Sequence, residues 1–191
     1  MAKYKMKIMG ADSTDLDVYE GLAASAKERG FTAMYLGALA ETTLDQEKTD
    51  YTDAWLRFSA SCAAIMKVVE TSLVHDILDK GHIEKNARMV AEKSRILEKY
   101  GLWGVTNFLE PMWLPESFYE AHPEMRGGRC DNPCLANEPY YSPCLDNKDV
   151  LEHYREAVRK FLELAPRAAV ITLGTNDSGA GICWSSGLYP G

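Results

Sequence analysis

A polar turn near the end of the chain holds the first side chains that could do chemistry. It spans residues 172–181 and follows the apolar run 168–171. A buried strand that leads into a polar, glycine-rich turn is where α/β proteins place catalytic groups. Asp177, with Asn176 beside it, is therefore the first catalytic candidate. The alternative is that both residues only stabilise the turn, since Asn and Asp side chains commonly bond nearby backbone.

Further carboxylates follow the other apolar runs that predict strands. These are Asp12, Glu41 and Glu110. If the strands are parallel, their carboxyl ends meet at one edge, and the carboxylates surround one mouth. Cleavage of a glycosidic bond needs a proton donor and a second carboxylate that acts as base or nucleophile. Glu110 is the best partner for Asp177 within this chain. Its alternative role, directly before Pro111, is the start of a loop.

Side chains suited to holding a sugar lie in the segment 112–147 and after the polar turn. Arg126 could bind a hydroxyl, carboxylate or sulfate group, or form a salt bridge with Glu124 or Asp131. Four aromatic side chains could stack on sugar rings. Their alternative, and commoner, role is packing, because aromatic residues dominate cores through their buried area. They are Trp113, Tyr140, Tyr141 and Trp184.

Metal and cofactor sites are not expected. Cys130, Cys134 and Cys144 share one segment, but a zinc site needs four ligands and only His122 is close in sequence. The chain has five cysteines. This odd number does not fit the disulfide framework of a secreted protein.

Four segments carry the patterns of strands. In the first, apolar side chains at positions 4, 6 and 8 alternate with lysines, which is the period of a strand with one polar face. The other three are largely apolar runs at 31–39, 102–109 and 168–171. Such runs are typical of strands covered on both faces of a parallel sheet.

Helical spacing of apolar residues alternates with these strands. The expected helices cover 16–26, 51–100 (two helices broken near Gly81) and 150–162. Thr14 and Asp17 form a capping pair at the start of the first helix. His75 and His82 are interpreted as surface or hinge residues. The segment 112–147 has no sustained period, and we expect a long loop that serves function.

The order of these segments predicts an α/β fold built as a right-handed parallel β-α series. Four strands in such a series match the front half of a (β/α)8 TIM barrel, which takes about 250 residues or more. We therefore expect residues 1–191 to be the N-terminal half of a TIM-barrel catalytic domain, truncated after the fourth β-strand. A fragment of this kind should expose apolar surface or self-associate.

Composition narrows the function classes. The chain has 191 residues, a formal net charge of −7 and 46% hydrophobic residues, which are ordinary values for a globular domain. Acidic residues spread along the chain disfavour binding of nucleic acid through a phosphate-neutralising surface. No apolar run reaches the length of a signal peptide or a membrane span, so we expect a cytoplasmic location and no membrane contact.

Several stretches in the second half of the chain form a pattern. They are Glu-Pro-Met-Trp-Leu-Pro-Glu at 110–116, His-Pro-Glu-Met-Arg-Gly at 122–127, Tyr-Tyr-Ser-Pro-Cys-Leu-Asp at 140–146, Thr-Asn-Asp-Ser-Gly at 175–179, Ile-Cys-Trp at 182–184 and Leu-Tyr-Pro-Gly at 188–191. The pattern resembles the front half of barrel glycoside hydrolases of the β-hexosaminidase-like and α-glucuronidase-like families. The first half of the chain resembles them only in layout.

The resemblance implies an O-glycosyl hydrolase that acts on a carbohydrate. In these families a proton-donating Glu commonly follows the fourth strand, where this chain has Asn176 and Asp177. In the working mechanism, Asp177 protonates the glycosidic oxygen, Asn176 bonds an adjacent sugar group, and a half-buried mouth behind Trp184 raises the pKa of the acid. The second carboxylate is expected outside this chain, so the chain alone should be inactive.

Two other classes fit the same residues. One is a carbohydrate-binding barrel without hydrolysis, and the other is a barrel lyase or isomerase that uses its carboxylates with a metal ion. Barrels host many chemistries, so the fold does not choose between them.

Overall fold

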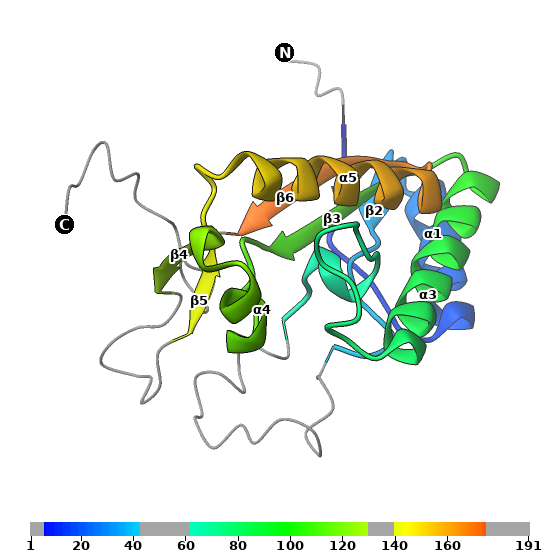
Figure 1. Ribbon diagram of the computed structural model, residues 1–191. Helices are drawn as coiled ribbons and strands as arrows, with labels where there is room; N and C mark the ends of the chain where they lie inside the picture. Colours follow the sequence, from blue (N-terminus) through cyan, green and yellow to red (C-terminus); the bar gives the residue numbers. More distant parts are fainter. Residues whose placement is uncertain (1–5, 43–61, 130–139, 175–191) are drawn as a thin grey trace, which may run out of the picture.

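A four-stranded parallel sheet is the centre of the computed structural model, which describes residues 6–42, 62–129 and 140–174 (Figure 1). The strands are β1 (Ile8–Met9), β2 (Ala33–Tyr35), β3 (Trp103–Leu109) and β6 (Ala168–Gly174). They lie in the order β1, β2, β3, β6, and each pair of neighbours is parallel. The order along the sheet is therefore the order along the chain. The predicted mixed α/β fold with a parallel sheet is confirmed.

In the described part of the chain, three long helices connect these strands and pack on one face of the sheet. They are α1 (Leu16–Glu28), α3 (Lys80–Lys99) and α5 (Lys148–Leu164). One core joins all three helices to the sheet, with Tyr19 from α1, Val90 from α3, Phe161 from α5, Met34 from β2 and Phe108 from β3. Helix α1 packs on α3, and α3 packs on α5. The helices form one layer that follows chain order (Figure 1).

Each long helix begins at a side chain that caps its first turn. Asp15 accepts hydrogen bonds from the backbone N–H groups of Asp17 (2.9 Å) and Val18 (3.1 Å), and Asn147 caps α5 in the same way. Such a cap satisfies donors that have no partner within the helix. The predicted capping residue Thr14 is wrong by one position, because it is the Asp15 carboxylate that reaches the free N–H groups.

The two faces of the sheet differ in how they are covered. On the helix side, Gly104 lies so close to Leu36 that a Cβ would come within 1.7 Å of the leucine side chain. The opposite face carries Ile8, Tyr35 and Trp103, whose exposed fractions are 43%, 38% and 43%. Within the described residues the sheet is open, and the long helices all lie on its other face. The closed barrel and its truncation after the fourth strand stay predictions.

The sequence predicts two helices over 51–100 with a break near Gly81. The prediction of the first helix is wrong from residue 62 onward. Residues 62–79 contain only the short 3-10 turn η1 (Ile65–Lys67). The reason is a tertiary contact: the Ile65 backbone N–H donates to Glu110 Oε1 at 2.7 Å instead of to a helical carbonyl. Residues 51–61 lie outside the described residues. The second helix of the pair is confirmed as α3.

The prediction of one long loop over 112–147 is also wrong. The segment holds α4 (Glu116–Ala121), the turn η2 (Pro123–Met125), and β4 (Arg126–Arg129) paired antiparallel with β5 (Tyr141–Pro143). These elements are too short to show a period, and β4 carries two glycines. One of them, Gly127, is needed, because a Cβ there would lie 2.6 Å from the Ser142 carbonyl oxygen. Residues 130–139 lie outside the described residues.

Two smaller expectations fail as well. His82, interpreted as a surface or hinge residue, is buried within α3 with 7% of its surface exposed, whereas His75 is exposed. Strand β2 covers three residues and not the whole run 31–39. No helix in the described part of the chain is long and apolar enough to cross a membrane. The cytoplasmic location stays a prediction.

Candidate functional site

The carboxyl ends of the parallel strands lie together, at what we call the strand-end edge of the sheet. Asp12 follows β1, Glu41 follows β2 and Glu110 follows β3, as the sequence predicts. The remaining predicted site residues at this edge, Asn176, Asp177 and Trp184, lie outside the described residues. Their roles stay predictions.

Glu110 is a buried carboxyl group with only 4% of its surface exposed. Its Oε1 accepts a hydrogen bond from the Ile65 N–H (2.7 Å), and its Oε2 accepts from the Met112 N–H (2.9 Å) and the Tyr154 hydroxyl (3.1 Å). Burial raises the pKa of Glu110, and the three hydrogen bonds act against that rise. The carboxyl group therefore ties together η1, the start of the segment after β3, and α5.

Lys67 lies near Glu110 and is one of the most deeply buried residues, with 1% of its surface exposed. Its amine donates hydrogen bonds to the carbonyl oxygens of Thr42 (2.7 Å) and Cys62 (2.5 Å). Burial lowers the pKa of Lys67 to about 8, while the Cys62 and Glu110 side chains favour its charged form. Sequence reasoning missed this residue. The pattern that could have indicated its burial is a single lysine inside the apolar run 63–69.

A second buried lysine joins the ends of β1 and β2. Lys93 on α3 donates to Asp12 Oδ1 at 2.5 Å and to the Ala38 carbonyl oxygen at 2.7 Å. Asp12 Oδ2 in turn accepts from the Ala38 N–H at 2.7 Å. Burial lowers the pKa of Lys93, and the Asp12 carboxylate acts in the opposite direction. Asp12 is thus engaged in holding two strand ends to a helix.

Glu41 lies in a more open position. Its carboxylate is 3.2 Å from the Lys85 amine and 3.7 Å from His82 Nδ1. Its backbone is held by Asn86, which accepts from the Glu41 N–H (2.9 Å) and donates to the Glu41 carbonyl (2.8 Å). Of the three described carboxylates at the strand-end edge, Glu41 is the most exposed, at 42% of its side chain.

The structure brings together four side chains that the sequence predicts as sugar-binding. We call the cluster the Arg126 patch, and it consists of Trp113, Tyr119, Arg126, Tyr140 and Tyr141. The Trp113 and Tyr140 rings lie 5.9 Å apart. The Arg126 guanidinium lies over the Tyr141 ring at 4.9 Å and over the Tyr119 ring at 5.4 Å. Sequence reasoning missed Tyr119.

Arg126 also forms an ion pair, with Glu116 of α4. This partner differs from Glu124 and Asp131, the two that the sequence suggests. The Arg126 side chain keeps 36% of its surface exposed, whereas Trp113 is buried at 8%. The patch therefore has a packed base and an exposed cationic rim.

The Arg126 patch is connected to Glu110 through the chain that follows β3. Met112, whose N–H bonds Glu110, directly precedes Trp113. The next residue, Leu114, donates its N–H to the Tyr141 carbonyl oxygen at 3.1 Å, and the Tyr119 hydroxyl donates to the same oxygen at 2.8 Å. A buried carboxyl and an aromatic patch are thus positioned by one short segment at the strand-end edge.

Metal ligation finds no support in the described part of the chain. It contains no group of three or more His, Cys, Asp or Glu side chains that could hold a metal ion. Cys130 and Cys134, two of the cysteines considered for zinc, lie outside it. The absence of a metal or cofactor site stays a prediction for the whole chain.

Comparisons with known proteins give a distant structural similarity. No family model and no curated protein matches the chain. Among solved structures, the chain is similar to a GH138 enzyme targeting pectin rhamnogalacturonan II, with 16% sequence identity and a TM-score of 0.42. The match covers 85% of this chain and 15% of the length of that enzyme. A similarity this low assigns neither a fold nor an activity to the chain.

Proposed function

We propose that the chain is part of a carbohydrate-acting enzyme of the glycoside hydrolase kind, with its site at the strand-end edge. The observation that carries this proposal is the Arg126 patch. Tyr140 and Tyr141 are half-buried beside the exposed Arg126 side chain, and partly exposed rings next to a few polar groups suit a sugar site, because rings contact the sugar and polar groups fix its orientation. Arg126 supplies a cationic donor for a hydroxyl, carboxylate or sulfate group.

In this proposal Asp177 is the general acid, Asn176 bonds an adjacent sugar group and Trp184 lies against the sugar. Glu110 is the second carboxylate near the patch. Because both of its oxygens already accept hydrogen bonds, we assign it the role of positioning the patch, with direct catalysis by Glu110 as the alternative. The proposed chain is the N-terminal half of a larger catalytic domain, and the remaining carboxylate belongs to the other half.

Sugar binding is tested on the chain as printed. The probes are methyl glucuronide and methyl glucoside, and binding is measured by ligand-observed NMR. Arg126→Ala should weaken glucuronide binding about tenfold, as expected for the loss of a charge-assisted contact. Arg95→Ala on α3, another exposed arginine paired with a nearby glutamate, is the matched control and should change nothing. The absence of saturable binding by the unmodified chain, or equal binding by Arg126→Ala, would remove the patch from the proposal.

Hydrolysis is tested in the longest natural form of the protein with aryl glycosides as substrates. Asp177→Asn should reduce kcat about a hundredfold or more, in line with the loss of a general acid, and Asp146→Asn, at an exposed position, is the control. Unchanged turnover in Asp177→Asn would exclude the acid role. Saturable sugar binding without any turnover would instead support the non-hydrolytic alternative, and loss of turnover on chelation would support the metal-assisted one.

A further inference from the structure

The positive charge of Arg126 is compensated within the protein. Its guanidinium Nη2 donates a hydrogen bond to Oε1 of Glu116, so one of its N–H groups already faces a carboxylate of the chain itself. A guanidinium has several N–H donors but a single positive charge. The ion pair therefore leaves N–H donors for the hydroxyl groups of a sugar, but it reduces the net charge that an acidic sugar would meet.

The position of the Arg126 guanidinium depends on aromatic rings as well as on Glu116. The guanidinium lies 4.9 Å from the centre of the Tyr141 ring and 5.4 Å from that of the Tyr119 ring, and ring faces attract cations. Tyr119 is itself fixed, because it is buried and its hydroxyl donates to the Tyr141 carbonyl oxygen. Loss of the Glu116 carboxylate should therefore leave Arg126 in place with its charge uncompensated.

Glu116 approaches Arg126 from a different element. It is the first residue of α4, whereas Arg126 begins β4. The segment before α4 is held by the bond from the Leu114 N–H to the Tyr141 carbonyl oxygen, so the contacts that position the Arg126 patch also position this carboxylate. The Glu116 side chain is 59% exposed, and a ligand that reaches Arg126 therefore also reaches Glu116.

Other carboxylates near Arg126 in the sequence are not paired with it. The Glu124 carboxylate lies 3.9 Å from His122 Nδ1 and is well exposed. Glu120, on the same short helix as Glu116, is an exposed residue. Among the described side chains, Glu116 is the carboxylate that forms an ion pair with Arg126.

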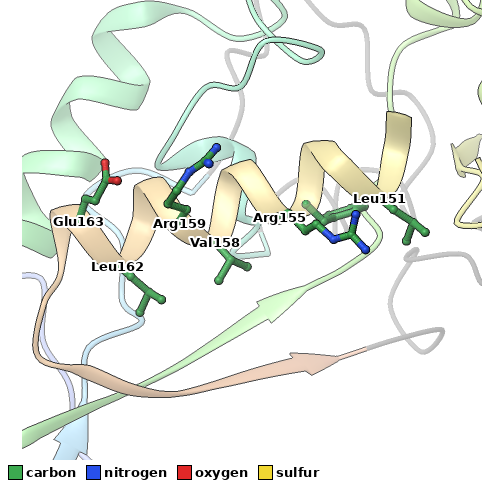
Figure 2. A pocket seen from close by; sticks show the side chains of 7 residues that line it. Leu151, Arg155, Val158, Arg159, Leu162 and Glu163 are labelled. Atoms are coloured by element: carbon green, nitrogen blue, oxygen red, sulfur yellow. The ribbon is translucent and has the colours of Figure 1, made fainter. Parts of the chain in front are cut away.

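An arginine on α5 shows how this ion pair differs from an ordinary surface pair. Arg155 projects from the surface of α5 (Figure 2), pairs with Glu152 on the same helix at 3.3 Å and keeps 72% of its side chain exposed. Arg126 is only 36% exposed, and its ion pair joins two elements beside two tyrosine rings. Exposed ion pairs contribute little to stability. The feature that distinguishes Glu116 is therefore its place in the candidate sugar site.

We propose that Glu116 is a specificity-determining residue of this site: its carboxylate competes with the carboxylate of an acidic sugar for Arg126, and so lowers the preference of the site for acidic over neutral sugars. The inference rests on the function proposed above, because it needs a sugar bound at the Arg126 patch. A neutral sugar bonds the remaining N–H donors and leaves the ion pair intact. An acidic sugar has to displace Glu116 or lie beside it, and two adjacent carboxylates repel each other.

The test compares two sugars that differ in charge. Dissociation constants of methyl glucuronide and methyl glucoside are measured by ligand-observed NMR for the unmodified chain and for Glu116→Gln, which keeps the size of the side chain and removes its charge. The variant should bind glucuronide about three- to fivefold more tightly, the size of effect expected for an exposed ion pair. Glucoside binding should stay unchanged. A variant that merely loosened the patch would weaken both sugars alike.

Two glutamates provide matched controls. Glu124→Gln removes the same charge two residues from Arg126, and Glu152→Gln removes a carboxylate that is paired with another arginine. At physiological ionic strength, which screens distant exposed charges, neither control should change the ratio of the two affinities. The double variant Arg126→Ala/Glu116→Gln should have the same ratio as Arg126→Ala, because the competition needs the guanidinium.

The outcomes separate this inference from the proposed function. If the unmodified chain binds sugar through Arg126 but the affinity ratio is the same in Glu116→Gln, or rises equally in Glu124→Gln, the role of Glu116 is overturned and the sugar site remains. If the unmodified chain binds neither sugar, both proposals are overturned. Circular dichroism melts check that each variant folds, and Glu116→Ala, which also removes the charge, should give the same rise in the ratio.

Discussion

Two buried lysines at the strand-end edge meet their carboxylates in different ways. Lys93 donates directly to Asp12 at 2.5 Å, and the pair joins two strand ends to α3. Lys67 donates to two backbone carbonyls and is coupled to Glu110 through charge. Glu110 itself is held by two backbone N–H groups and a tyrosine hydroxyl. The same residue types thus make a fixed ion pair in one place and, in the other, a carboxyl group with a raised pKa.

The two buried lysines also differ in the groups that act on their pKa. Burial lowers the pKa of Lys93, and the Asp12 carboxylate in direct contact with it opposes that change. For Lys67 and for Glu110, burial is the largest influence and moves each pKa toward the neutral form, while the charge of the other residue acts in the opposite direction. Lys67, whose pKa falls to about 8, should therefore change protonation just above neutral pH, and Glu110 is linked to the Arg126 patch through the Met112 N–H.

The largest expected effect comes from breaking the direct pair. Lys93→Met leaves the Asp12 carboxylate without its cation in a largely buried position, and it should lower the free energy of unfolding by about 3 to 5 kcal/mol. Urea denaturation measures the change. Lys85→Met, which removes an exposed partner of Glu41, is the control and should cost less than about 1 kcal/mol. A loss as small in Lys93→Met as in the control would show that the buried pair contributes little.

Removing the other carboxyl group should cost somewhat less. Glu110→Ala leaves the N–H groups of Ile65 and Met112 without their acceptor, and we expect a loss of about 3 kcal/mol in the free energy of unfolding. Glu110→Gln keeps an oxygen acceptor and should lose only about 1 kcal/mol. Urea denaturation of both variants gives the comparison. Equal losses would mean that the negative charge of Glu110, and not its hydrogen bonds, holds the segment.

Lys67 should make stability depend on pH. Its pKa is lowered to about 8 from 10.5, so between these values the unfolded chain binds more protons than the folded one. The cost of burying the charged amine is fully present below about pH 8 and is relieved as the pH rises through it. Between about pH 8 and about pH 10 this relief should be on the order of 2 kcal/mol.

The measurement is the difference in unfolding free energy between the unmodified chain and Lys67→Met across that pH range. Other titrating groups cancel in this difference. The unmodified chain should gain stability relative to the variant as the pH rises. A difference that stays constant would mean that Lys67 keeps an ordinary pKa despite its burial.

The smallest expected effect concerns the hydroxyl that bonds Glu110. Tyr154→Phe removes one donor from Oε2 and should lower the free energy of unfolding by about 1 kcal/mol. Because that hydrogen bond favours the charged carboxylate, the pKa of Glu110 should rise further in the variant. NMR titration of the labelled Glu110 carboxyl carbon measures this rise, with Tyr100→Phe, whose hydroxyl bonds Glu20, as the control. An unchanged titration would contradict the role given to Tyr154.

Features that depend on local periodicity could be predicted from the chain. The runs that became β3 and β6 have the length and composition of buried strands, and the stripes that became α3 and α5 have helical spacing. The structure places Trp113, Tyr140, Tyr141 and Arg126, predicted separately as sugar-binding residues, in one cluster. Their sugar-binding role is not yet tested.

Features that depend on long-range partners could not be predicted. The apolar spacing before Gly81 suggested a helix, but Glu110, 45 residues away, takes the Ile65 N–H. Lys67 and Lys93 look like surface residues in the sequence, since lysine is seldom fully buried. Lys67 donates to the carbonyl oxygens of Thr42 and Cys62, and Lys93 donates to Asp12. These acceptors lie close to the two lysines only when the strand ends meet.

The sequence by itself determined the alternation of strands and helices, the parallel α/β class and the placement of carboxylates after strands, because these follow from the spacing of apolar residues along a few turns or pleats. Only the tertiary structure decided which carboxylates are engaged. Asp12 and Glu110 stand in the same sequence context, but one meets an amine and the other meets N–H groups and a hydroxyl. The physical reason is that burial sets the cost of a charge, and burial arises only when distant segments pack together.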